Sequence, residues 1–71
     1  MNEQDKRVLK FLGDKLKALR LQKDISQEKL AELTGLDRTY ISGLERGLRN
    51  PSFLIIKKLA NALDITPSVL F

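Results

Sequence analysis

The sequence predicts an all-α fold of five short helices, and three observations support this. Apolar residues recur at three- and four-residue steps over most of the chain, which is the period of one helix face. No run of residues alternates between apolar and polar, and β-branched residues are few and scattered, so strand signals are missing. Ser, Asp and Thr precede the apolar segments as helix caps do, and glycines follow two of these segments as helix stops do.

The first helix is expected from Gln4 to about Gln22. Its apolar stripe has Lys and Arg between its members and consists of Val8, Leu12, Leu16 and Leu19. The chain is then interrupted by KDIS, and Ser26 is a good N-cap for the next helix.

The second helix runs over residues 27–34 and ends at Gly35, which tolerates the left-handed conformation of a helix end. Asp37 is the expected N-cap of a third helix that continues to Arg46, with another glycine directly after it.

Ser52 caps a fourth helix that extends to about Leu63. Its core stripe is expected to consist of Phe53, Ile56, Leu59, Ala60 and Leu63. Thr66 and Pro67 are suited to the cap and first position of a fifth helix. That helix would hold Val69, Leu70 and Phe71.

Length and composition limit the function classes. The 71 residues are expected to form one domain, 1–71, and a formal charge of +4 favours an anionic partner such as nucleic acid or a membrane surface. The chain has neither Cys nor His, and no phosphate-binding glycine loop. These absences argue against disulfides, metal sites and catalysis, so we expect no enzyme, no cofactor and no small-molecule ligand. No segment has the apolar length of a membrane span or a signal peptide, so we expect a cytoplasmic protein without a membrane partner.

The second and third helices, separated by TGLD, predict a helix-turn-helix over about residues 27–46. Ala31 is small enough for two helices to cross closely, Gly35 supplies the turn, and Leu36 would pack beneath it. Ile41 and Leu44 would anchor the third helix from behind.

The other face of the third helix is polar. At about 100° per residue, one quadrant of it contains Arg38, Thr39, Ser42 and Arg46. Gly43 borders this quadrant, and a helix backbone without a Cβ would let another body come close, as in a DNA major groove. The alternative is an ordinary solvated face.

The segment SQEKLAELTGLDRTYISGLERGLRNPS, residues 26–52, resembles the DNA-binding domain of the Cro and phage-repressor type, also called the xenobiotic-response-element family. The resemblance covers about residues 16–71. Within the family, LDRTYISGLER is most similar to the controller proteins of restriction–modification systems. The resemblance implies a five-helix, phage-repressor-like fold whose third helix enters the major groove. Phage or plasmid repressors and antitoxins are the alternatives within this family.

The resemblance also implies site residues. Candidate base contacts are Gln27, Arg38, Thr39 and Ser42. Candidate contacts to phosphates or the groove wall are Tyr40, Arg46, Arg49 and Asn50. The charge of Lys23, apart from the resemblance, makes it a further candidate for contact with phosphate. Independently, the forked guanidinium of Arg38 fits the O6 and N7 atoms of guanine. Gly43 departs from the family, because several phage repressors have a long base-reading side chain there.

Glu45 needs a cation, because an unpaired carboxylate between the polar face and the core would repel phosphate. Arg20, near the end of the first helix, is the candidate, and the resemblance implies the same partly buried pair. We therefore predict a direct contact within about 4 Å.

Residues 52–71 are expected to form a homodimer interface, because the last two helices carry more apolar surface than one small chain buries. The candidate residues are Leu54, Ile55, Val69, Leu70 and Phe71. A dimer would present two third helices about 34–36 Å apart to a pseudo-palindromic operator. Depending on operator position, it would block RNA polymerase or contact it.

Two other function classes fit the sequence less well. A protein-interaction adaptor of the same fold should expose apolar residues on the third helix, where this chain carries Arg, Thr and Ser. Membrane-surface binding by the basic first helix is disfavoured by its acidic residues and short apolar stripe.

Overall fold

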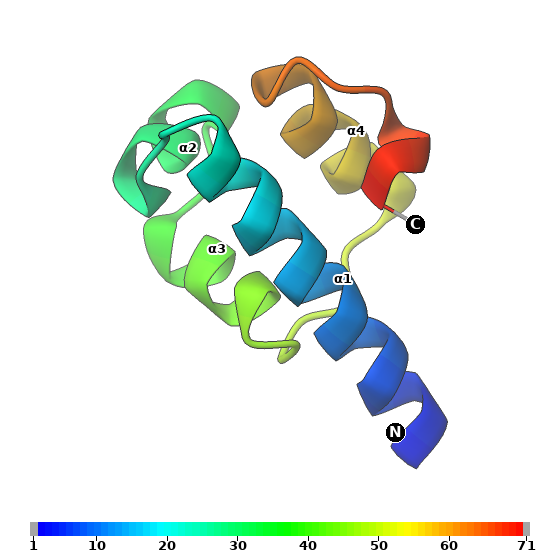
Figure 1. The fold of residues 1–71 in the computed structure, drawn as a ribbon. Coiled ribbons are helices and arrows are strands. Elements are labelled where there is room, and N and C mark those ends of the chain that lie inside the picture. Colours follow the sequence, from blue (N-terminus) through cyan, green and yellow to red (C-terminus); the bar gives the residue numbers. More distant parts are fainter. Residues whose placement is uncertain (1, 71) are drawn as a thin grey trace.

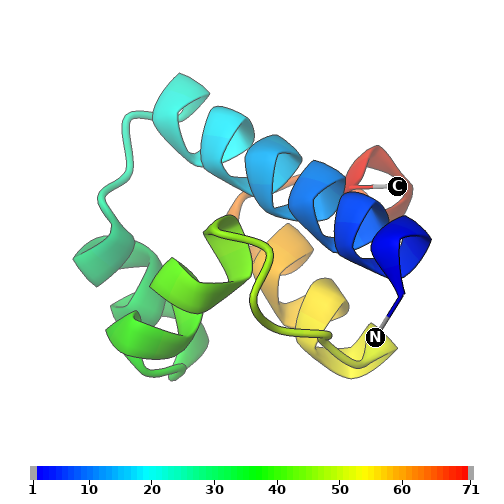
Figure 2. The ribbon, with the colours of Figure 1, turned by 90° about the horizontal axis from the view of Figure 1, so that it is seen from below.

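The computed structural model describes residues 2–70, which contain four α-helices, one 3₁₀ helix and no strand (Figure 1). The α-helices are α1 (Glu3–Gln22), α2 (Gln27–Thr34), α3 (Arg38–Glu45) and α4 (Phe53–Ala62), and the 3₁₀ helix is η1 (Pro67–Leu70). α1 crosses the molecule, and in Figure 1 α2 and α3 lie to one side of its axis and α4 and η1 to the other. In Figure 2, which is turned by 90°, α2, α3 and α4 all lie below α1. α3 packs against both α1 and α2.

α2, α3 and α4 begin where the sequence predicts, because the expected cap side chain of each accepts a hydrogen bond from an amide of the first turn. Ser26 accepts from the N–H of Lys29 at 3.0 Å, and Asp37 accepts from the N–H of Thr39 at 2.7 Å. Ser52 does the same for α4. These bonds fix the starts of α2 and α3, and therefore the positions of their first residues.

The prediction of a fifth α-helix is wrong. Pro67–Leu70 is a 3₁₀ helix, and the N–H of Val69 donates to the carbonyl of Thr66 at 3.0 Å, three residues back. The Thr66 hydroxyl lies 3.2 Å from the Ser68 hydroxyl and makes no cap to the backbone. This three-residue spacing is that of the tighter 3₁₀ helix, which proteins use in short pieces. Phe71 lies outside the described residues.

The core is formed by aliphatic side chains from all five helices. Its buried members are Leu16, Leu30, Ile41, Leu44, Ile56, Leu59, Ala60, Leu63 and Leu70. Half-buried Leu12, Leu19, Leu36 and Ile55 pack against them. This core lies directly behind α3, so it holds that helix from its inner side.

Two residues predicted for the core are exposed. Val8 and Phe53 are each 60% exposed. The N-terminal part of α1 extends past the other helices (Figure 1), so only Leu9 of that region turns inward, at 7% exposed. Phe53 is the first residue of α4 and therefore lies at the helix end, whereas Ile56, one turn later, is buried.

In residues 2–70 no helix has both the length and the apolar character needed to cross a bilayer.

Candidate nucleic-acid interface

α2 and α3 meet at a turn that glycine makes feasible. Gly35 adopts a left-handed conformation with φ of +74°, and its N–H donates to the carbonyl of Ala31 at 2.8 Å. Ile41 and Leu44 are fully buried at 0% and 2% exposed, as predicted. The apolar side of α3 is therefore anchored, and its orientation is fixed by packing.

The outer side of α3 carries the predicted polar residues. Arg38, Thr39 and Arg46 are exposed, and Ser42 is half-buried. None of the large apolar side chains exposed in residues 2–70 belongs to α3. A cationic and hydroxylated helix face therefore points outward, and such groups suit phosphates and base edges.

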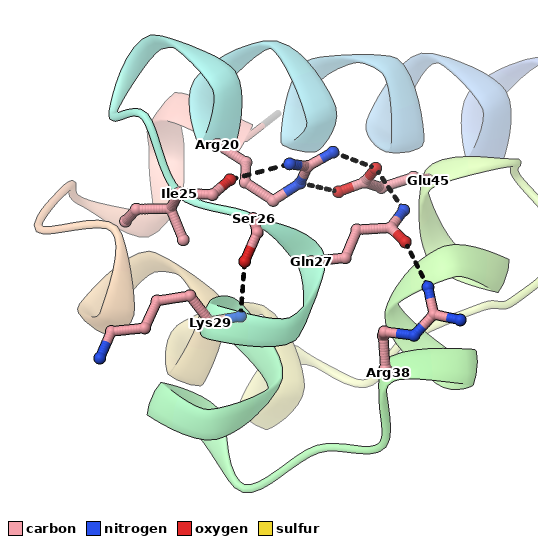
Figure 3. A network of polar contacts seen from close by, with 7 residues as sticks. All are labelled: Arg20, Ile25, Ser26, Gln27, Lys29, Arg38 and Glu45. Atoms are coloured by element: carbon pink, nitrogen blue, oxygen red, sulfur yellow. Dashed lines mark hydrogen bonds and ion pairs between the residues drawn. The ribbon is translucent and has the colours of Figure 1, made fainter.

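Arg20 and Glu45 form the predicted ion pair beneath this face (Figure 3). Arg20 Nε donates to Glu45 Oε2 at 2.7 Å and Nη2 donates to Oε1 at 3.0 Å, while Nη1 donates to the carbonyl of Ile25 at 2.8 Å. The hydrogen bond to Glu45 raises the pKa of Arg20 and outweighs the opposite effect of burial. The guanidinium therefore stays charged, and α1 is tied to α3 by a two-pronged contact.

Gln27 links this buried pair to the exposed Arg38 (Figure 3). Its amide Nε2 donates to Glu45 Oε1 at 3.0 Å, and its Oε1 accepts from Arg38 Nη1 at 3.3 Å. The side chain of Gln27 is thus engaged inside the protein, although we expected it to face a base or phosphate. The sequence offered no signal for this link, because it joins a side chain of α2 to two side chains at opposite ends of α3.

The expectation that Gly43 presents a bare backbone to a groove is wrong. Gly43 is buried, and a Cβ at this position would lie 3.1 Å from Arg49 Cγ and 3.3 Å from Arg49 Nε. The Arg49 guanidinium carbon lies 6.0 Å from the centroid of the Tyr40 ring. The segment after α3 folds back, so the body that approaches Gly43 is the chain's own arginine.

Gly13 is a positioning residue that sequence reasoning missed. A Cβ at Gly13 would clash with the carbonyl of Leu44 and would stand 2.6 Å from the carbonyl oxygen of Glu45. α1 therefore approaches the backbone of α3 without an intervening side chain. The one available signal was a glycine inside a helical pattern.

Comparison with known proteins identifies this arrangement. Residues 16–70 match the model of a family described as helix-turn-helix. The chain belongs to this helix-turn-helix family. Its predicted likeness to restriction–modification controller proteins is also confirmed by the relatives that follow.

Three helix-turn-helix relatives are informative. The control protein C.MunI of a Mycoplasma species is 50% identical over 60 residues, which cover 83% of this chain and 81% of that protein. The crystal structure of the controller protein C.AhdI from Aeromonas hydrophila has a TM-score of 0.85 and 55% identity, covering 92% of this chain and 97% of that one. The controller protein C.Esp1396I, solved as a tetramer with its natural 35-base-pair operator, has a TM-score of 0.82 and 38% identity, covering 90% and 84%.

The remaining predicted contacts surround the helix-turn-helix. Lys23 and Asn50 are exposed, but they lie at opposite ends of α1, because Lys23 caps its C-terminus and Asn50 lines a hollow with Asp5 and Val8. Their contact with DNA stays a prediction.

The predicted dimer residues of the helix-turn-helix chain differ in exposure. Leu54 is 72% exposed and Val69 is 37% exposed, and Ile55 is half-buried. Leu70 is 1% exposed and belongs to the core of the single chain, so it has no surface to offer a partner. This corrects its assignment to the interface. Phe71 lies outside the described residues.

Proposed function

We propose that the chain is a sequence-specific regulator of transcription that binds a pseudo-palindromic operator as a homodimer and controls a restriction–modification system. One observation carries the proposal: the outward face of α3 is cationic and hydroxylated, and its first residue, Arg38, is held by Gln27. The family and the controller-protein relatives support the same function.

Arg38 is proposed as the main base contact. Its hydrogen bond to Gln27 leaves the Nη2 side of the guanidinium available, and Gln27 is itself fixed by Glu45. A guanidinium restrained in this way pairs with guanine O6 and N7 at a smaller loss of side-chain freedom. Thr39, exposed next to it, offers a hydroxyl to a base edge or a methyl to thymine.

The exposed cations around α3 are proposed as phosphate contacts. Arg46, Arg49 and Lys23 are all exposed. Contacts of this kind position a protein on the duplex and make binding fall with salt, but they carry no direct sequence information. Sequence specificity therefore depends on the residues of α3, and affinity for DNA depends on the exposed cations around this helix.

A homodimer is proposed because α3, the helix that would contact the bases, is short. α3 has eight residues, so one copy reads few base pairs, and a twofold pair reads two half-sites one helical turn apart. The exposed Leu54 and Val69 supply apolar surface for the contact between copies. The operator-bound tetramer of C.Esp1396I supports assembly on DNA in a related protein.

Footprinting and gel shifts test the proposal. We expect the chain to protect a pseudo-palindromic site in the DNA upstream of its own gene. Arg38→Ala should weaken binding to that site by about 1–3 kcal/mol and reduce the preference over unrelated duplexes. Lys58→Ala is the matched control, because it eliminates an exposed cation of α4 and not one of α3. It should leave the preference for the operator over unrelated duplexes unchanged. Equal binding of the unmodified chain to all duplexes would contradict an operator function.

A further inference from the structure

The chain after α3 turns back along the helix because of a glycine-based reversal. Gly47 has a φ of +75°. Its N–H donates to the carbonyl of Leu44 at 3.1 Å, and the N–H of Leu48 donates to the carbonyl of Gly43 at 2.9 Å. These two bonds form a Schellman motif, which satisfies the last carbonyls of the helix. The next residue, Arg49, is thereby brought back to the level of Gly43.

The side chain of Arg49 lies over Gly43. A Cβ on Gly43 would stand 3.1 Å from Arg49 Cγ and 3.3 Å from Nε, which is tighter than ordinary side-chain packing. Glycine inside a helix is less stabilising than alanine, so Gly43 lowers the local stability of α3. Arg49 occupies the space that the missing side chain leaves.

Tyr40, one turn before Gly43, contacts the other end of the same arginine. The Arg49 guanidinium carbon lies 6.0 Å from the Tyr40 ring centroid, at the outer limit of a cation–π contact. Tyr40 is half-buried and Arg49 is exposed, so the charge remains open to an anionic partner. Arg49 is therefore held along its stem by Gly43 and at its head by Tyr40.

We propose that Gly43 is a positioning residue for DNA binding, because its missing side chain lets Tyr40 hold the Arg49 guanidinium against the edge of α3. The inference rests on the proposed function, in which Arg49 contacts the DNA backbone. A cation that is already ordered loses less conformational freedom when it binds phosphate. Gly43 thus strengthens binding through Arg49 and without touching the DNA itself.

Proton NMR of the free protein tests the arrangement without DNA. The ring current of Tyr40 should shift the Arg49 δ-protons upfield, and Gly43→Ala should abolish the shift. Tyr40→Leu should abolish it as well, which identifies the source, since Tyr40 is the one tyrosine of the chain. Unshifted Arg49 protons in the unmodified chain would overturn the proposal.

A double-mutant cycle tests the effect on binding to a labelled duplex carrying the footprinted site. Gly43→Ala should weaken binding about two- to fivefold, the size of an exposed cation–π contact, and should have no further effect in an Arg49→Ala background. The thermal midpoint of Gly43→Ala should not fall, because Arg49 can move and alanine favours the helix. The proposal is overturned if Gly43→Ala leaves binding unchanged or weakens it equally with and without Arg49. If the unmodified chain shows no preferred duplex, the proposed function fails and the positioning role fails with it, even where the Arg49 protons are shifted.

Discussion

The guanidinium of Arg20 is a buried charge whose three hydrogen bonds connect it to Glu45 and to the carbonyl of Ile25. Both side chains of the ion pair are nearly inaccessible, at 8% and 3% exposed. Burial of a charge is expensive, and this pair is tolerated because each partner compensates the other. The ion pair therefore matters less for net stability than for holding α3 at a fixed place on α1.

Removal of one partner should be worse than removal of both. Glu45→Leu leaves Arg20 buried and unpaired and should lower the free energy of unfolding by about 3–5 kcal/mol. The double variant Arg20→Leu with Glu45→Leu should recover part of this loss, because no buried charge remains. Urea unfolding of the unmodified chain, the single variants Glu45→Leu and Arg20→Leu, and the double variant measures the difference. Single losses that simply add in the double variant would contradict the coupling.

Arg38 and Arg49 should differ in what they contribute to DNA binding. Arg38→Ala should reduce discrimination among operator sequences, because Arg38 is held at the first position of α3. Arg49→Ala should weaken binding to all DNA sequences alike, and it should flatten the slope of log affinity against log salt concentration by about one unit. Fluorescence anisotropy over a panel of duplexes and salt concentrations distinguishes the two. Identical profiles for both variants would refute this division.

At the residue scale, the sequence was informative where one side chain had a local need. Glu45 lies between a polar face and a core face, and that position alone called for a cation, which Arg20 provides. The link through Gln27 could not be predicted, because it joins side chains of α2 and α3, and the placement of these helices against each other is a tertiary fact.

At the scale of elements, two glycines sit inside helices for different reasons. Gly13 of α1 faces the backbone carbonyls of Leu44 and Glu45, whereas Gly43 of α3 faces the flexible side chain of Arg49. Backbone carbonyls of a packed helix cannot move aside, but the end of an arginine can. The same substitution should therefore have opposite consequences at the two positions.

Gly13→Ala should lower the free energy of unfolding by about 1–3 kcal/mol or more, because the added methyl forces α1 away from α3. The gain in helix propensity, about 1 kcal/mol, is too small to offset this overpacking. Gly43→Ala serves as the matched variant and should be at least as stable as the unmodified chain. Thermal unfolding followed by circular dichroism compares them. A stable Gly13→Ala variant would mean that the two helices are not in such close contact.

The element boundaries follow from short-range rules. The side chains of Ser26, Asp37 and Ser52 each accept a hydrogen bond from a backbone N–H within three residues, so these caps can be predicted from the sequence. Thr66 has the right type for a cap, yet its hydroxyl lies beside that of Ser68 and the segment after it is a 3₁₀ helix. A cap signal indicates where a helix can begin, but it does not decide which kind of helix forms.

On the scale of the whole molecule, two neighbouring apolar side chains are exposed at the start of α4. Phe53 and Leu54 are 60% and 72% exposed, and Val69 of η1 is 37% exposed. The chain's core is already filled by Ile56, Leu70 and their neighbours, so these side chains have no place inside it. A second copy of the chain would remove them from water.

Leu54→Lys should therefore convert the proposed dimer to monomer and weaken operator binding, with little change in the unfolding of the monomer. Sedimentation velocity at micromolar concentration measures the oligomeric state. Leu21→Lys is the control, because it makes the same change at a leucine that is 57% exposed but lies at the end of α1. A dimer that survives Leu54→Lys would exclude this surface.

The sequence by itself determined the four α-helices, the caps of α2, α3 and α4, the glycine turn and the charged face of α3, because each depends on contacts within a few residues or on helix periodicity. Only the tertiary structure decided that Leu70 belongs to the core, that Val8 and Phe53 do not, and that Arg49 covers Gly43. These outcomes depend on how far α1 extends past its neighbours and on where the chain folds back. Periodicity assigns a side chain to a face of its helix, but it does not say what lies opposite that face.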